Sequence, residues 1–221
     1  MYFRMLHDEG SGLITYLLAD LDAREAVLID PRPADAAVIH AMLSEHHLQP
    51  VAVVHTDDHA ADQAADHIAY GPHAPALPSA LAHPPWPAPA RMTDGDMLAF
   101  GAQHLRCLGT PGHTRQGRSY LWRDRLFCGG VLSPWLCPEA AAVDNPAQLW
   151  ESIMARVFRQ PAETLLFPGH SCAGWTVSNV FTQRKHHPWL SSKSRDEALQ
   201  AIAQGPLHDN FHPPSAPTDS E

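Results

Sequence analysis

The first quarter of the chain alternates short apolar runs with one amphipathic stretch. Apolar runs that end in polar or turn-forming segments predict β-strands at residues 2–6, 13–19, 26–29 and 51–54. Residues 34–46 carry apolar side chains at helical spacing, which predicts a helix between the third and fourth strands. A polar loop follows the fourth strand, and a second helix is expected at residues 60–69. This order is typical of an α/β fold, in which ligands gather at the carboxyl ends of strands.

The patterns change at residues 71–90, which are rich in proline and therefore disfavour helices and central strands. We interpret this segment as a long surface loop rather than a domain boundary, because regular β patterning resumes after it. A second sheet and three further helices are expected beyond the loop. The strands are predicted at 97–100, 103–108, 119–122, 126–128 and 164–167, and the helices at 146–158, 177–186 and 195–203. The first of these helices has Asn145 in the N-cap position and Pro146 at its first position.

Length and charge restrict the class of protein. A chain of 221 residues fits one large domain, which we place at residues 1–205. The remaining residues, 206–221, are rich in proline and polar side chains, and we expect them to be disordered. The formal net charge of -9 argues against a nucleic-acid partner, because phosphate contacts need clustered Lys and Arg.

The cysteines and the apolar runs indicate a cytoplasmic protein that does not cross a membrane. The four cysteines form no CxxC pair, which is typical of reduced thiols rather than a disulfide framework. No secretory signal is visible at the start, and no apolar run approaches the ~18 residues that span a bilayer. The sequence leaves the oligomeric state open.

Three polar motifs each follow a predicted strand. They are Thr56-Asp57-Asp58-His59-Ala60-Ala61-Asp62, Thr110-Pro111-Gly112-His113-Thr114 and Pro168-Gly169-His170. In this order they resemble the metallo-β-lactamase superfamily, especially its persulfide dioxygenase and glyoxalase II branch. The resemblance covers nearly the whole chain before the tail. It implies a four-layer αββα sandwich with a metal site along one edge of the two packed sheets.

The chain departs from the family at several metal-binding positions. The family's first motif is Thr-His-x-His-x-Asp-His, so Asp57 replaces its first histidine, Ala61 replaces its aspartate and Asp62 replaces its last histidine. Gly130 stands at the position of the family's bridging aspartate. The histidines that remain at family positions are His59, His113 and His170.

The resemblance implies that one metal ion would be held by Asp57, His59 and His113. Two imidazoles and one carboxylate suit either iron(II) or zinc with an open position. Asp62 and His170 would then either hold a second ion weakly or lie beside the first. Two alternatives stay open: the acidic residues only cap a helix and no metal is bound, or a shifted loop lets His55 replace the missing first histidine.

The implied substrate is a small thiol compound, either a persulfide or a glutathione conjugate. In the family, basic residues near the last motifs receive the glutathione carboxylates, and Arg184 and Lys185 occupy a matching segment. Loss of the carboxylates at Ala61 and Gly130 favours one-metal persulfide chemistry over two-metal thioester hydrolysis. The alternative function is a catalytically inactive relative that has lost its metal and serves as a binding or interaction domain.

Overall fold

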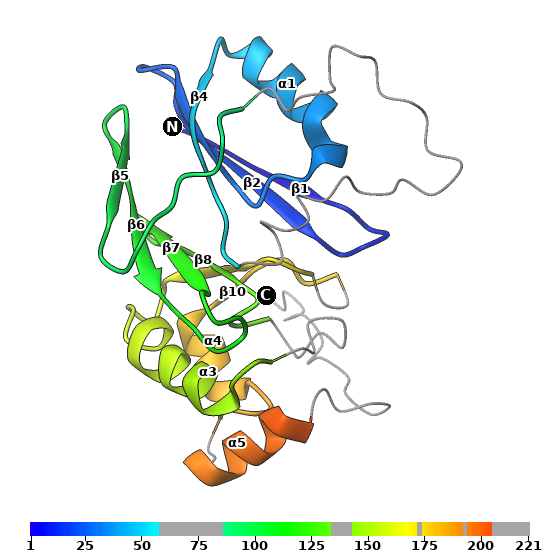
Figure 1. Cartoon of the computed structure of the whole chain (residues 1–221), viewed down its shortest axis with the longest axis vertical. Helices are drawn as coiled ribbons and strands as arrows, with labels where there is room; N and C mark the ends of the chain where they lie inside the picture. Colours follow the sequence, from blue (N-terminus) through cyan, green and yellow to red (C-terminus); the bar gives the residue numbers. More distant parts are fainter. Residues whose placement is uncertain (58–85, 134–142, 172–173, 192–193, 205–221) are drawn as a thin grey trace, which may run out of the picture.

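The computed structural model describes residues 1–57, 86–133, 143–171, 174–191 and 194–204. The amino-terminal part forms a four-stranded sheet in the order β1-β2-β3-β4 (Figure 1). Its strands are β1 (Tyr2–His7), β2 (Ile14–Asp20), β3 (Glu25–Ile29) and β4 (Gln49–Val54). The first three strands pair antiparallel, whereas β3 and β4 run parallel. Helix α1 (Ala36–Glu45) connects β3 to β4, as a parallel crossover requires.

The later part of the chain forms a second, six-stranded sheet in the order β10-β9-β8-β7-β6-β5. Its strands are β5 (Met97–Phe100), β6 (Gln103–Gly109), β7 (Arg118–Trp122), β8 (Arg125–Gly129), β9 (Leu165–Pro168) and β10 (Ser178–Asn179). Strands β8 and β9 are parallel, and the segment between them includes α3 (Pro146–Ser152) and η4 (Ile153–Val157). Helices α4 (Val180–His186) and α5 (Arg195–Gln204) follow.

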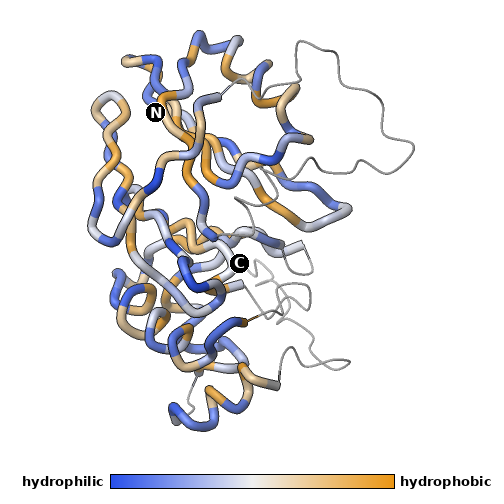
Figure 2. The backbone as a smooth tube through the Cα atoms, viewed as in Figure 1, coloured by the Kyte–Doolittle hydropathy of each residue, from blue (hydrophilic) through white to orange (hydrophobic). Residues whose placement is uncertain are grey.

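Three buried clusters show that the two sheets and the helices form four layers. One cluster lies between the sheets and includes Tyr16 from β2 and Phe127 from β8, whose ring centroids are 4.9 Å apart. A second cluster packs Ile39 of α1 against the outer face of the first sheet. The third includes Ile153 and Ile202 and covers the outer face of the second sheet. The hydrophobic stretches drawn along the backbone in Figure 2 include the strands that form these clusters. The expected α/β sandwich of the αββα type is confirmed.

Most predicted elements are present, with differences at their ends. The predicted helix at 34–46 begins as a 3-10 turn, η1 (Pro33–Asp35), and becomes α-helical at Ala36. Asn145 caps α3 as expected, since its side chain accepts a hydrogen bond from the backbone N–H of Gln148 at 3.1 Å. The single helix predicted at 146–158 is wrong in detail, because its second half is a π-helix in which Phe158 N bonds to Ile153 O.

The helix predicted to begin at residue 177 begins at Val180. Ser178 and Asn179 instead pair with β9 as the short strand β10, which the sequence pattern did not predict. The Asn179 side chain then caps α4 by accepting a hydrogen bond from the backbone N–H of Thr182 at 2.7 Å. The predicted helix at 60–69 and the tail at 206–221 lie outside the described residues, so both stay predictions, as does the domain boundary at residue 205.

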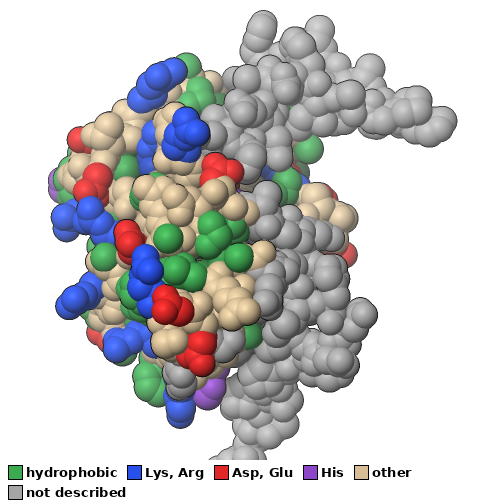
Figure 3. Space-filling model, turned by 60° about the horizontal axis from the view of Figure 1, so that its bottom comes forward, with side chains coloured by type: hydrophobic (Ala, Val, Ile, Leu, Met, Phe, Trp, Pro, Cys, Tyr) green, Lys and Arg blue, Asp and Glu red, His purple; other side chains and the backbone are tan. Residues whose placement is uncertain are grey.

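The described surface has mixed charge. On the face shown in Figure 3, basic and acidic side chains are interspersed among polar and apolar ones. Within the described ranges, every helix is too short or too polar to cross a membrane. The expected cytoplasmic location stays a prediction.

Candidate functional site

The three sequence motifs converge on Gly129 and Gly130, at the end of β8. A Cβ atom built on Gly129 would lie closer than 3.0 Å to side-chain atoms of Thr56, which precedes Asp57. A Cβ atom built on Gly130 would lie closer than 3.0 Å to three ring atoms of His113. Gly169, in the third motif, donates its backbone N–H to the Gly129 carbonyl at 3.0 Å. Segments far apart in the sequence therefore meet at one strand end, where α/β proteins build their sites.

Asp30 holds the first motif in place. Its carboxylate accepts hydrogen bonds from the Thr56 backbone N–H at 2.8 Å and from the Thr56 hydroxyl at 2.7 Å. Asp30 is buried and has a φ of 50°, a left-handed conformation that non-glycine residues rarely adopt. The Thr56 carbonyl accepts a further bond from Arg118 N at 2.7 Å. The chain therefore reaches Asp57, which is partly exposed, from a fixed backbone position.

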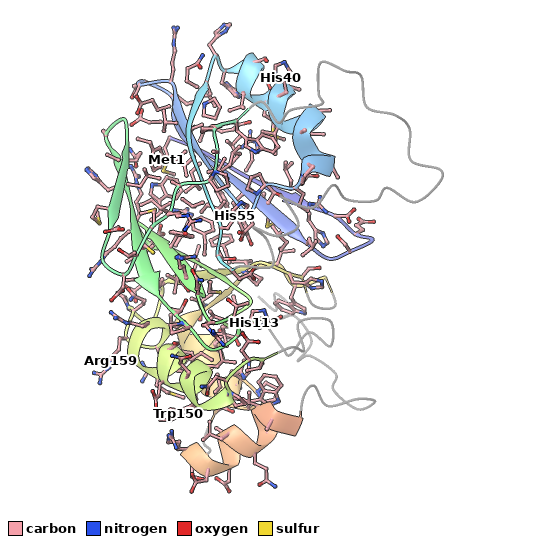
Figure 4. The ribbon with its side chains drawn as sticks, in the orientation of Figure 1. Met1, His40, His55, His113, Trp150 and Arg159 are labelled. Carbon is pink, nitrogen blue, oxygen red and sulfur yellow. The ribbon has the colours of Figure 1, made fainter. Side chains whose placement is uncertain are left out.

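His55 is buried and immediately precedes Thr56, the first residue of the first motif. His55 is 7% exposed, and its Nδ1 atom lies 3.5 Å from the Asp30 carboxylate. Its carbonyl accepts a hydrogen bond from the Tyr120 hydroxyl at 2.8 Å; burial raises the pKa of that phenol, which therefore stays protonated. Figure 4 labels His55, which follows β4 of the first sheet, and His113, which lies between β6 and β7 of the second. Substitution of His55 for the family's first histidine would require its ring to leave this buried position.

The loop that carries His113 is anchored to the start of α3. Gly112 O accepts a hydrogen bond from Asn145 N at 2.9 Å, and His113 O accepts one from Asp144 N at 3.1 Å. Gly112 has a φ of 129°, and a Cβ atom there would lie closer than 3.0 Å to the Leu149 backbone, so only glycine fits. His113 itself is 7% exposed. Its buried ring occupies the space beside Gly130 that a side chain at position 130 would need.

His170 lies against the turn between β1 and β2. Its Nδ1 atom is 2.8 Å from the Ser171 carbonyl oxygen, and its backbone pairs with Leu13 in an isolated bridge. A Cβ atom built on Gly12, whose φ is 73°, would lie closer than 3.0 Å to the His170 ring. This contact between the first hairpin and the third motif had no signal in the sequence pattern.

The other predicted site residues are separate from this group or outside the described residues. Arg184 and Lys185 lie exposed on the last turn of α4, and the Lys185 ammonium is 5.7 Å from the Phe181 ring centroid. His59 and Asp62 fall within residues 58–85, outside the described ranges. Within those ranges, no group of three or more His, Cys, Asp or Glu side chains is arranged to hold a metal ion.

Position 130 offers no bridging ligand for a second metal ion. Gly130 offers no carboxylate, and the His113 ring fills the space beside it, so a bridging ligand has neither an atom nor room at this position. The ligand set that the resemblance implies for a single site is one carboxylate, Asp57, and two imidazoles, His113 and His59, the last of which lies outside the described residues. Such a set matches the ligand chemistry of iron(II) or zinc.

Comparison with individual proteins identifies the family, although no family model matches the chain. It is 30% identical to the human mitochondrial persulfide dioxygenase ETHE1 over 198 residues, which is 85% of this chain and 75% of that protein. It is 31% identical to the hydroxyacylglutathione hydrolase of Yersinia enterocolitica over 169 residues, 75% of this chain and 63% of that protein.

Solved structures agree with the sequence relatives. The crystal structure of ETHE1 from Myxococcus xanthus matches with a TM-score of 0.72 and 29% identity, covering 92% of this chain and 90% of that one. A metallo-β-lactamase from Staphylococcus aureus, at 19% identity, shares the fold with a TM-score of 0.67 and covers 97% of this chain and 68% of that one. The chain therefore belongs to the metallo-β-lactamase superfamily, in the branch of the persulfide dioxygenases and hydroxyacylglutathione hydrolases.

Proposed function

We propose that the protein is a metal-dependent enzyme that acts on a small sulfur compound, a persulfide or a glutathione conjugate. One metal ion would be held by Asp57, His59 and His113. The observation that supports this proposal is that Thr56, which precedes Asp57, and His113 both pack on the glycines at the end of β8. The relatives in the same branch include a persulfide dioxygenase and a hydroxyacylglutathione hydrolase.

The chain's own residues would prepare this site by position and by burial. Asp30 orients the segment that leads into Asp57, through its two bonds to Thr56. The buried His113 would meet a bound ligand in a low-dielectric environment, which strengthens electrostatic contacts. A bound iron ion would supply open coordination positions for sulfur and dioxygen, whereas a zinc ion would polarise a carbonyl as a Lewis acid.

Asp62, His170, Arg184 and Lys185 would act around the metal ion. Asp62 and His170 would lie beside it or bind a second ion weakly. Arg184 and Lys185 would receive the carboxylates of a glutathione-derived substrate by charge-assisted hydrogen bonds. Their exposure on α4 keeps both cations accessible to a molecule in solution.

The site favours persulfide oxidation over thioester hydrolysis. Hydrolysis by two metal ions needs a bridging group to hold and aim a hydroxide. At Gly130 the carboxylate is missing and the His113 ring fills the adjacent space. We expect persulfide oxidation at one metal ion to need no bridging group. In the overall reaction, one persulfide, one dioxygen and one water yield one thiol and one sulfite with its protons.

The direct test measures metal content and turnover of the full chain. Protein produced with iron and zinc in the medium is assayed for bound metal, for oxygen uptake and sulfite release with glutathione persulfide, and for hydrolysis of a glutathione thioester. We expect about one metal ion per chain, persulfide-dependent oxygen uptake and little thioester hydrolysis. Asp57→Ala and His113→Ala should lower metal affinity at least about 10- to 100-fold, whereas His104→Ala, at an exposed position on β6, should not.

Two outcomes would contradict the proposal. A folded protein that binds neither metal and consumes no oxygen with the persulfide would support the inactive, metal-free relative. Rapid thioester hydrolysis that a chelator abolishes would show instead that two ions are bound and that the one-metal assignment is wrong.

A further inference from the structure

His7 and Ser171 join two segments that are far apart in the sequence. His7 ends β1, and its Nε2 atom lies 2.7 Å from the Ser171 hydroxyl oxygen. The Ser171 backbone N–H donates to the Gly12 carbonyl at 2.8 Å, on the turn that follows β1. Ser171 is 9% exposed, and its hydrogen bond to His7 is partly buried. The first hairpin therefore holds the residue that follows His170 at two points.

The third contact of Ser171 determines the tautomer of His170. The Ser171 carbonyl oxygen lies 2.8 Å from His170 Nδ1. A carbonyl oxygen has no proton to donate, so Nδ1 must carry the proton of this bond. In a neutral imidazole the other nitrogen, Nε2, then keeps its lone pair, which is the form that binds a metal or accepts a proton.

The ring position of His170 depends on the same hairpin. A Cβ atom on Gly12 would lie closer than 3.0 Å to His170 Cε1 and Nε2, so the ring packs directly on the glycine backbone. His170 and Leu13 also pair through their backbones. The ring, its backbone and the carbonyl that fixes its proton are thus all held by the segment from His7 to Leu13.

We propose that His7 is a positioning residue, which acts through Ser171 to hold His170 in the Nδ1-protonated form, so that Nε2 is the acceptor nitrogen of the neutral ring. His7 itself touches neither His170 nor a substrate in this scheme. Its ring fixes the Ser171 hydroxyl, and Ser171 in turn presents its carbonyl to His170. The use of Nε2 near a metal ion rests on the proposed function, whereas the tautomer itself does not.

The test reads the tautomer directly by nitrogen NMR of the histidine rings. Spectra are recorded at pH about 8.5, two units above the ordinary histidine pKa of about 6.5, so that neutral rings dominate. The His170 signal is assigned by its loss in His170→Gln. We expect the Nδ1-protonated pattern in the parent protein, and its loss or exchange broadening in His7→Phe and Ser171→Ala.

Matched variants separate positioning from a general loss of structure. His7→Gln keeps a polar group near the Ser171 hydroxyl and should retain much of the Nδ1-protonated pattern of His170. His104→Phe, which also replaces a strand histidine but at an exposed position on β6, should leave it unchanged. Because His7 and Ser171 act in series, the double variant His7→Phe/Ser171→Ala should lose no more of the pattern than either single variant.

The outcomes of this test are distinct from those of the function assay. Persistence of the Nδ1-protonated pattern in folded His7→Phe would overturn the positioning role. Absence of that pattern in the parent protein would also overturn it, because the Ser171 carbonyl would then not accept from His170. A parent protein that shows the pattern but takes up no metal would support the positioning role and contradict the proposed function alone.

Discussion

Gly130→Ala tests the packing on which the candidate site depends. A Cβ atom at this position would lie closer than 3.0 Å to Cδ2, Nε2 and Cγ of His113, whereas ordinary van der Waals contact begins at 3.4 Å. The His113 ring must therefore shift to accommodate a single methyl group. Gly130 is not one of the glycines with a positive φ. The cost of a side chain there therefore arises from the contact with the His113 ring rather than from backbone strain.

Two opposing effects set the size of the change. Overpacking a buried contact costs about 1–3 kcal/mol. Replacing glycine by alanine recovers about 0.4–1 kcal/mol by reducing the conformational entropy of the unfolded chain. The strain is the larger effect, so we expect a net loss of about 1–2 kcal/mol. For a domain of this size, that loss lowers the Tm by about 2–8 °C.

The assay is urea and thermal unfolding of a double-mutant cycle. In the His113→Ala background no ring opposes the new methyl group, so Gly130→Ala should be neutral or slightly stabilising. The coupling free energy between the two positions should reach about 1–3 kcal/mol. Gly10→Ala is the matched control, because its nearest neighbours are Asp8 oxygens at 3.9 Å and its φ is not positive.

Either of two results would contradict this packing of His113 against Gly130. Effects of Gly130→Ala and His113→Ala that add within about 0.5 kcal/mol would show that the two residues do not share space. A Gly130→Ala variant as stable as Gly10→Ala would show that room for a side chain exists at position 130, so His113 would not exclude a bridging ligand there.

Three further predictions concern the frame around the site. Tyr120→Phe removes the donor to the buried His55 carbonyl and should cost about 1–3 kcal/mol in urea unfolding, and an unchanged midpoint would contradict the bond. Burial raises the pKa of the Cys107 thiol to about 11 and that of the Cys128 thiol to about 12. Neither thiol should therefore react with iodoacetamide at pH 8 until urea unfolds the chain. Mass spectrometry that finds either cysteine alkylated in the native protein would refute this. A backbone N–H hydrogen bond lowers the pKa of Asp94 below its usual 3.8 in the folded chain. The stabilisation is therefore present above about pH 4 and is lost as the pH falls through the folded value. Asp94→Asn should make the free energy of unfolding fall less steeply with decreasing pH on the acid side, and an unchanged slope would count against this prediction.

The sequence alone determined the two sheets and the family. Alternating and continuous apolar runs report which side chains face a core, because strand and helix periods relate neighbouring positions directly. The order of the three motifs then identified the metallo-β-lactamase branch, and the residue types at Asp57, Ala61 and Gly130 predict a departure from the family's metal-binding pattern. Periodicity, motif order and residue type depend on single positions or short segments, so they can be read from the sequence without the tertiary structure.

Local pattern did not decide the ends of several elements. Strand β10 forms because Ser178 and Asn179 find partners on β9, and the π-helical half of the predicted helix appears within a packed layer. Hydrogen bonds to distant strands and packing against other layers compete with local propensity, and their strength depends on neighbours that are remote along the chain.

The geometry of the candidate site was decided by the tertiary structure. The filling of the space beside Gly130 by His113, and the contact of His7 with Ser171 across 164 positions, each depend on atoms brought together only when the two sheets pack. The sequence gives glycine at position 130, which offers no carboxylate, but it does not show that an imidazole occupies the space beside it. Periodicity encodes which face of an element is buried, whereas long-range contacts depend on how buried faces from separate elements meet.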